Sequence, residues 1–167
     1  ETVANTFLNI CKNVPFLNRI ELVKQSLFSQ VENKFFSSQD NDDFVYAEDR
    51  EVLHNYYKQQ VELQVDNMIT TTNTVDIYKL LWNNINNYTT LDLEEIKSLT
   101  IDCINFKEVK YEDITALIYI RSALEGFRTY NNMKHVLIDE AQDYSPLFYE
   151  IIKQSFPNAS ITIMGEL

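Results

Sequence analysis

Glycine is nearly absent from this chain, since its 167 residues contain only Gly126 and Gly165. A loop that wraps phosphate groups with backbone N–H donors needs several glycines at fixed spacing. No Gly-x-x-x-x-Gly-Lys-Ser/Thr segment occurs among the printed residues. The sequence therefore excludes a complete glycine-rich phosphate loop within these residues.

Cysteine and long apolar runs are also scarce. The two cysteines, Cys11 and Cys103, lie far apart and show no metal-ligand spacing. Such cysteines are typical of thiols in a reducing cytoplasm. No apolar run approaches the roughly 18 residues that a membrane span needs, and no basic-then-apolar signal opens the chain. The sequence predicts a cytoplasmic protein with no membrane association.

Positive charge is in short supply, because 14 Lys and Arg face 25 Asp and Glu, for a net charge of −11. A domain that grips nucleic-acid phosphates along its surface is expected to be basic. We therefore expect this chain not to bind duplex DNA tightly by itself. Any DNA contact is expected to involve other parts of a larger protein.

The acidity is concentrated in one run between residues 40 and 51. It contains Asp40, Asp42 and Asp43, with the apolar Phe44 and Tyr46 among the charges. The commoner explanation of such a run is a solvated loop. The alternative is a nucleic-acid mimic whose apolar tip contacts a basic partner surface.

Apolar side chains recur at helical spacing through most of the chain. Gly126 follows the last of these stripes and is expected to end that helix. The stripes are expected to form core. They predict helices over residues 3–14, 20–35, 52–68, 75–85, 93–106 and 114–124.

The helical spacing of apolar residues ends before residues 135–143, which read HVLIDEAQD. The run Val136-Leu137-Ile138 predicts a buried strand of a parallel sheet, preceded by a packed His135. Ser145 and Pro146 are expected to cap and open a helix. Residues 161–164 predict a second strand that ends at Gly165. Strand, helix and strand in this order form a parallel βαβ unit with a right-handed crossover. The fold class is therefore mainly α with a small parallel β portion.

Asp139 and Glu140 stand where the first predicted strand ends. Open α/β sheets bind their ligands at this edge. One carboxylate there can hold Mg²⁺, directly or through water, and the next can orient or deprotonate a water that attacks a phosphate. The bland alternative is a strand that runs into an acidic turn. The longer string DEAQD, with Gln142 and Asp143, favours the nucleotide site.

The segments HVLIDEAQDYSP and ITIMGEL resemble two ATPase motifs of the UvrD/Rep-like superfamily-one helicases. Within that group the chain is similar to HelD-like proteins, which act on bacterial RNA polymerase, and residues 111–119 share this similarity. The resemblance implies that Asp139 is the magnesium-site aspartate and Glu140 the catalytic glutamate. It also implies that Gln142 and Asp143 link the nucleotide state to the next motif.

By the same resemblance, Gly165 begins that next motif, in which the family usually has aspartate where this chain has Glu166. The family's sensor glutamine for the γ-phosphate is not among the printed residues. This difference leaves the role of Glu166 open.

The resemblance implies two domains. Residues 1–107 are expected to form a helical insertion, or arm, and residues 108–167 a partial RecA-like α/β fragment of the P-loop NTPase class. The chain is expected to be a piece of a larger parent protein that uses ATP and Mg²⁺, and to be inactive alone because it lacks the phosphate loop.

Three hypotheses for function stay open. The first is a generic UvrD/Rep helicase whose insertion contacts DNA. The second is a HelD-like factor that remodels or recycles the RNA polymerase core, which the acidic balance favours. The third is a non-enzymatic helical interaction domain, which the spacing of the two motifs disfavours.

Overall fold

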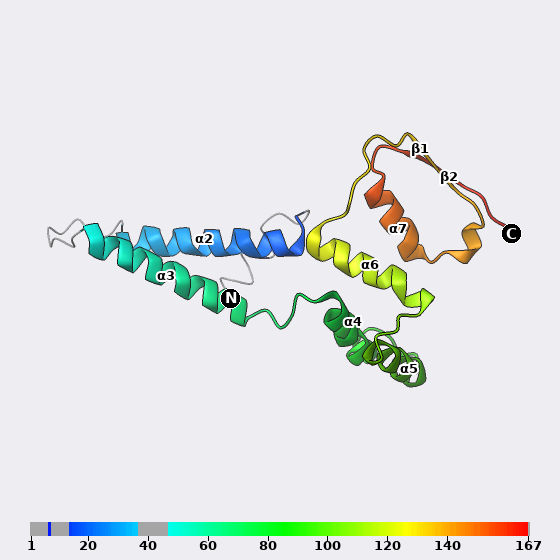
Figure 1. Cartoon of the computed structure of the whole chain (residues 1–167), viewed down its shortest axis with the longest axis horizontal. Coiled ribbons are helices and arrows are strands. Elements are labelled where there is room, and N and C mark those ends of the chain that lie inside the picture. The colour runs from blue at the N-terminus through cyan, green and yellow to red at the C-terminus, as the bar shows by residue number, and fades with distance from the viewer. Residues whose placement is uncertain (1–6, 8–13, 37–46, 167) are drawn as a thin grey trace. The chain divides into compact units, whose positions relative to one another are not determined.

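The computed structural model describes residues 7, 14–36 and 47–166 (Figure 1). Its helices are α2 (Phe16–Phe36), α3 (Ala47–Asn67), α4 (Thr74–Asn83), α5 (Glu94–Asn105), α6 (Tyr111–Glu125) and α7 (Pro146–Ser155). Its strands are β1 (His135–Ile138) and β2 (Ser160–Ile163), and its 3-10 turns are η1 (Ile85–Asn87) and η2 (Ala141–Asp143). The predicted fold class, mainly helical with a small parallel sheet, is confirmed. The helix expected over residues 3–14 lies almost wholly outside the described residues.

The chain divides into two compact units, residues 1–71 and 72–167. The boundary predicted near residue 107 therefore lies inside the second unit. The physical reason is that α4 packs against both α5 and α6. The functional division into a helical insertion and an ATPase fragment stays a prediction.

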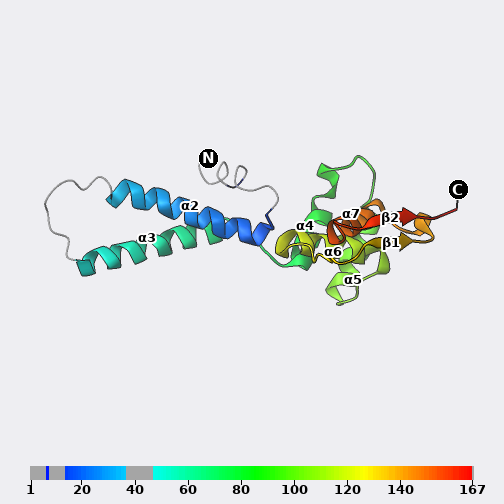
Figure 2. The ribbon, with the colours of Figure 1, turned by 90° about the horizontal axis from the view of Figure 1, so that it is seen from above.

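In the first unit, α2 and α3 form an antiparallel helical hairpin, seen side by side in Figures 1 and 2. Ile20 and Val23 of α2 and Val65 of α3 are buried where the helices meet. Lys24 Nζ lies 2.7 Å from Asp66 Oδ1 and ties the two helices together. That hydrogen bond is the main reason that the pKa of Lys24 is raised above its ordinary value.

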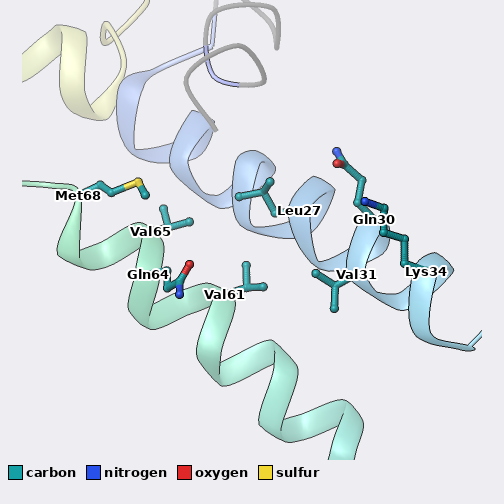
Figure 3. A pocket seen from close by; sticks show the side chains of 8 residues that line it. All are labelled: Leu27, Gln30, Val31, Lys34, Val61, Gln64, Val65 and Met68. Atoms are coloured by element: carbon teal, nitrogen blue, oxygen red, sulfur yellow. The ribbon is translucent and has the colours of Figure 1, made fainter. Parts of the chain in front are cut away.

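A groove of about 240 Å³ runs between the two helices of this hairpin (Figure 3). Val31 and Val61 line its apolar part, and Gln30, Gln64 and Lys34 lie along it. On α3, Val52 and Tyr56 remain 67% and 53% exposed. The prediction that the whole α3 stripe is core was therefore wrong for these residues, because within this unit only α2 packs against α3 among the described elements.

The second unit begins with three packed helices. Asn73 caps α4 by accepting hydrogen bonds from Val75 N at 2.9 Å and Asp76 N at 3.1 Å. Buried Tyr78 of α4 donates its hydroxyl to Asp113 Oδ1 of α6 at 2.6 Å. Burial, and then this hydrogen bond, raise the pKa of Tyr78 to about 12.

Helices α5 and α6 differ in how closely they follow the sequence pattern. On α5 the buried residues are Thr100 and Ile104, whereas Ile96 and Phe106 of the predicted core stripe are 52% and 79% exposed. The stripe is helical as predicted within α5, whereas Leu93 and Phe106 at its ends are the cap residues of this helix. The assignment of Ile96 and Phe106 to the core was wrong. Gly126 ends α6 at φ 106°, a conformation that favours glycine, so its predicted capping position is confirmed.

The βαβ unit has the predicted parallel pairing, with His135 opposite Ser160 and Ile138 opposite Ile163. The strands were expected to be buried, but Leu137 is 60% exposed and only Ile138 of β1 is buried. A sheet of two strands cannot cover both of its faces. His135 is likewise exposed, and its Nε2 lies 3.0 Å from Thr162 Oγ1 on the paired strand.

Helix α7 joins the two strands. Pro146 is its first residue as predicted, and Ser145 occupies the capping position. The Ser145 side chain, however, makes no capping hydrogen bond. Among the described residues, no helix combines the length and the hydropathy of a membrane span.

Candidate nucleotide site

Asp139 and Glu140 directly follow β1, at the carboxyl end of the parallel sheet. The apolar run before them forms the strand because its residues suit an extended backbone, and the strand stops where the two carboxylates begin. Both residues are exposed. The structure therefore presents two neighbouring carboxylates to solvent at the edge where α/β sheets bind ligands.

Glu140 adopts a left-handed backbone conformation, with φ 50° and ψ 48°. This conformation costs a residue other than glycine roughly 1–2 kcal/mol, so it persists only where the surroundings hold it. Glu140 N donates to Asp139 Oδ1 at 2.9 Å, and Asp143 N donates to Glu140 O at 3.0 Å. These bonds close the η2 turn and direct the chain away from the strand.

Gln142 connects this turn to the end of β2. Its Nε2 donates to Glu140 Oε2 at 2.7 Å, and its Oε1 accepts from Glu166 N at 3.1 Å. Gly165 makes room for that amide, since a Cβ added there would lie 2.7 Å from Gln142 Oε1. Glu166 thus contacts Gln142 through its backbone N–H. Aspartate and glutamate carry the same backbone N–H, so this contact does not depend on which of the two residues is present.

Ala141 is held from two other elements. Its N–H donates to Met164 O beyond β2 at 2.9 Å, and its carbonyl accepts the Tyr149 hydroxyl of α7 at 2.6 Å. Sequence reasoning missed Ala141 and Tyr149. A signal was present for Tyr149, because a tyrosine on a half-buried helix face needs a partner for its hydroxyl.

The structure thus brings together Asp139, Glu140, Gln142 and Gly165, with Asp143 in the same turn. The predicted partner-binding residues of the acidic run, Asp40, Asp42, Asp43, Phe44 and Tyr46, lie outside the described residues.

The donor set at β1 fits Mg²⁺ bound jointly with a nucleotide. Asp139 Oδ1 accepts the Glu140 N–H, and the second carboxylate oxygen makes no hydrogen bond within the described part of the chain. Mg²⁺ usually keeps several waters and takes one or two carboxylates together with substrate phosphates. Such a site does not require a protein cage. The described residues contain no group of three or more His, Cys, Asp or Glu placed to hold a metal.

The described residues thus form a parallel βαβ unit with two carboxylates after its first strand, which Gln142 joins by hydrogen bonds to the end of its second strand. The family model described as the UvrD/REP helicase N-terminal domain matches residues 7–166. The chain belongs to this helicase family, whose members in general use ATP and Mg²⁺. No curated protein matches the chain.

Proposed function

We propose that this chain supplies the magnesium-binding and water-activating part of the ATP site in an ATP-dependent DNA helicase or translocase of the UvrD-like family. The observation that carries the proposal is the adjacent placement of Asp139 and Glu140 after β1, with the Glu140 carboxylate held by Gln142. Membership of the UvrD/REP helicase family supports the same conclusion.

The two carboxylates have different tasks in this mechanism. Asp139 helps to hold Mg²⁺, which when bound neutralises charge on the transferred phosphoryl group. Glu140 orients the attacking water and accepts its proton. Gln142 holds one carboxylate oxygen of Glu140 at 2.7 Å, which leaves the other oxygen to face the water. Positioning of this kind lowers the barrier because the reacting groups need not be ordered during the reaction.

In this proposal, phosphate binding is the task of other residues of the parent protein, because the printed residues contain no glycine-rich phosphate loop. We therefore expect the 167-residue chain to hydrolyse no ATP by itself. Magnesium-dependent turnover by the purified chain that Glu140→Gln abolishes would contradict this expectation.

The role of Asp139 is tested in the parent protein with Asp139→Asn, which retains the shape of the side chain and removes its charge. Nucleotide affinity is measured by calorimetry with Mg²⁺ and with EDTA. We expect the variant to lose affinity with Mg²⁺ and to match the unaltered protein in EDTA. Equal affinities in both buffers would remove Asp139 from the metal site. Asp102→Asn, at an exposed position on α5, is the matched control.

A HelD-like role on the RNA polymerase core is the second candidate. The observation that favours it is the net charge of −11, which suits a basic protein surface better than nucleic acid. In this proposal the acidic run, with Asp40, Asp42, Asp43, Phe44 and Tyr46, contacts the polymerase.

This candidate is tested by titrating the parent protein against core polymerase and against single-stranded DNA at two salt concentrations. Replacing Asp40, Asp42 and Asp43 by Asn should slow association with polymerase and flatten its salt dependence, because charge contacts steer encounter. Phe44→Ala should mainly speed dissociation. Tight DNA binding together with no polymerase binding would favour the generic helicase, whose insertion contacts DNA.

A further inference from the structure

Tyr149 of α7 links this helix to the carboxylate turn by a hydrogen bond, and Phe148 of the same helix stacks on Tyr144 at a centroid distance of 4.3 Å. The Tyr149 hydroxyl donates to Ala141 O at 2.6 Å, and this contact is partly buried. The ring is fixed from the side by Phe148, whose centroid lies 5.7 Å away at an interplanar angle of 82°. A short hydrogen bond from a fixed ring gives the carbonyl a defined direction.

The Ala141 carbonyl has one weaker second partner. Tyr144 N donates to it at 3.3 Å, a long contact that closes the 3-10 turn. The Ala141 N–H is already engaged by Met164 O at 2.9 Å. The peptide group before Ala141 is therefore hydrogen-bonded to the end of β2, and the peptide group after it is hydrogen-bonded to α7.

Ala141 stands between the two side chains that matter for hydrolysis. Glu140 precedes it in a left-handed conformation, and Gln142 follows it and holds the Glu140 carboxylate. A strained backbone of this kind keeps its geometry only when neighbouring contacts over-determine it. Release of the Ala141 carbonyl would loosen both neighbours without touching any group that binds nucleotide.

We propose that Tyr149 is a positioning residue for Glu140, which acts through the Ala141 carbonyl and fixes the turn that aims the carboxylate. This inference rests on the proposed role of Glu140 in ATP hydrolysis. Tyr149 itself contacts neither the nucleotide nor the water. It affects how often the Glu140 carboxylate is in place and leaves the affinity of the site for ATP unchanged.

The test uses the parent protein with Tyr149→Phe, which removes one hydroxyl and retains the ring. We expect kcat for ATP to fall about threefold to tenfold, the scale of one net hydrogen bond, with KM within about twofold of the unaltered value. Replacing Tyr149 by para-aminophenylalanine, which keeps a donor at the same place, should restore most of kcat. Tyr144→Phe is the matched control, because it alters a neighbouring tyrosine whose hydroxyl makes no hydrogen bond within the described residues.

A double-mutant cycle separates this inference from the function on which it rests. In the Glu140→Gln background, Tyr149→Phe should cause no further loss, since it acts through Glu140. An unaltered rate in Glu140→Gln alone would overturn the proposed function itself. If Glu140→Gln is slow but Tyr149→Phe turns over normally, or lowers the rate equally in both backgrounds, the positioning role is overturned. A KM rise or an unfolding-temperature drop that accounts for the whole effect would also contradict it.

Discussion

Removal of the Tyr78 hydroxyl should destabilise the second unit of the chain, because it breaks a buried hydrogen bond between α4 and α6. In Tyr78→Phe, Asp113 Oδ1 loses its donor at 2.6 Å, and Asp113 Oδ2 is already buried without a hydrogen-bond partner among the described residues. Asp113 is 6% exposed, so solvent cannot replace the lost bond without rearrangement of the helices.

The magnitude follows from the kind of bond that is lost. A hydrogen bond to a carboxylate contributes about 1.5–3 kcal/mol to stability, and Tyr78→Phe supplies no new interaction that would offset its loss. For a unit of this size, a loss of about 2 kcal/mol lowers the unfolding temperature by roughly 10 °C. We expect this shift in thermal unfolding of the 167-residue chain followed by circular dichroism.

The matched control is Tyr111→Phe on α6, because Tyr111 is 75% exposed and its hydroxyl makes no hydrogen bond within the described residues. It should leave the unfolding temperature within about 1 °C of the original value. If Tyr78→Phe and Tyr111→Phe unfold at the same temperature, the Tyr78–Asp113 bond does not join α4 to α6 in the way described.

Three further predictions concern the pH dependence of stability, a helix cap and the nucleotide site. The pKa of Tyr78 is raised from 10.0 to about 12, so the stability that neutral Tyr78 contributes is complete below pH 10 and is lost as pH rises through about 12; unfolding measured across this window should be less pH-dependent in Tyr78→Phe. Asn73→Ala should lower the free energy of unfolding by about 1 kcal/mol, because alanine is a poor residue at the N-cap of α4. Asn73→Gly should lower it by only a few tenths of a kcal/mol, because glycine is tolerated there. Equal losses of the two variants in urea denaturation would contradict the capping role. Gly165→Ala places a Cβ 2.7 Å from Gln142 Oε1 and should displace that amide, which would slow ATP turnover in the parent protein with little change in unfolding temperature. An unaltered rate would show that the amide does not hold Glu140.

The helices were predictable because apolar residues at helical spacing mark most of the segments that are helical in the structure. Residues 75–85 and 114–124 were expected to be helical, and α4 and α6 cover most of the first range and all of the second. Which face each helix buries did not follow from the sequence. On α5 the apolar Ile96 is exposed while Thr100 is buried, because a neighbouring helix, and not hydropathy alone, decides which face is covered.

The candidate nucleotide site could likewise be predicted only in part from the sequence. The placement of Asp139 and Glu140 at the end of a strand followed from local sequence, since an apolar run and its polar boundary lie side by side in the chain. The left-handed turn at Glu140 and the Tyr149 contact did not follow, because they depend on hydrogen bonds from β2 and α7 that form only when the βαβ unit closes. Gly165 was located through a family resemblance, and its close approach to Gln142 gives the physical reason for a glycine there.

The most direct test of the central claim is the rate of ATP hydrolysis by the parent protein carrying Glu140→Gln, with Glu150→Gln on α7 as the control. The amide retains the shape of the side chain and removes the base. We expect nucleotide affinity to stay close to that of the unaltered protein and kcat to fall by about 10²-fold or more, the scale of losing a positioned base. The control should hydrolyse ATP normally. Turnover at the original rate in Glu140→Gln would contradict the assignment of Glu140 as the residue that activates water in this helicase site.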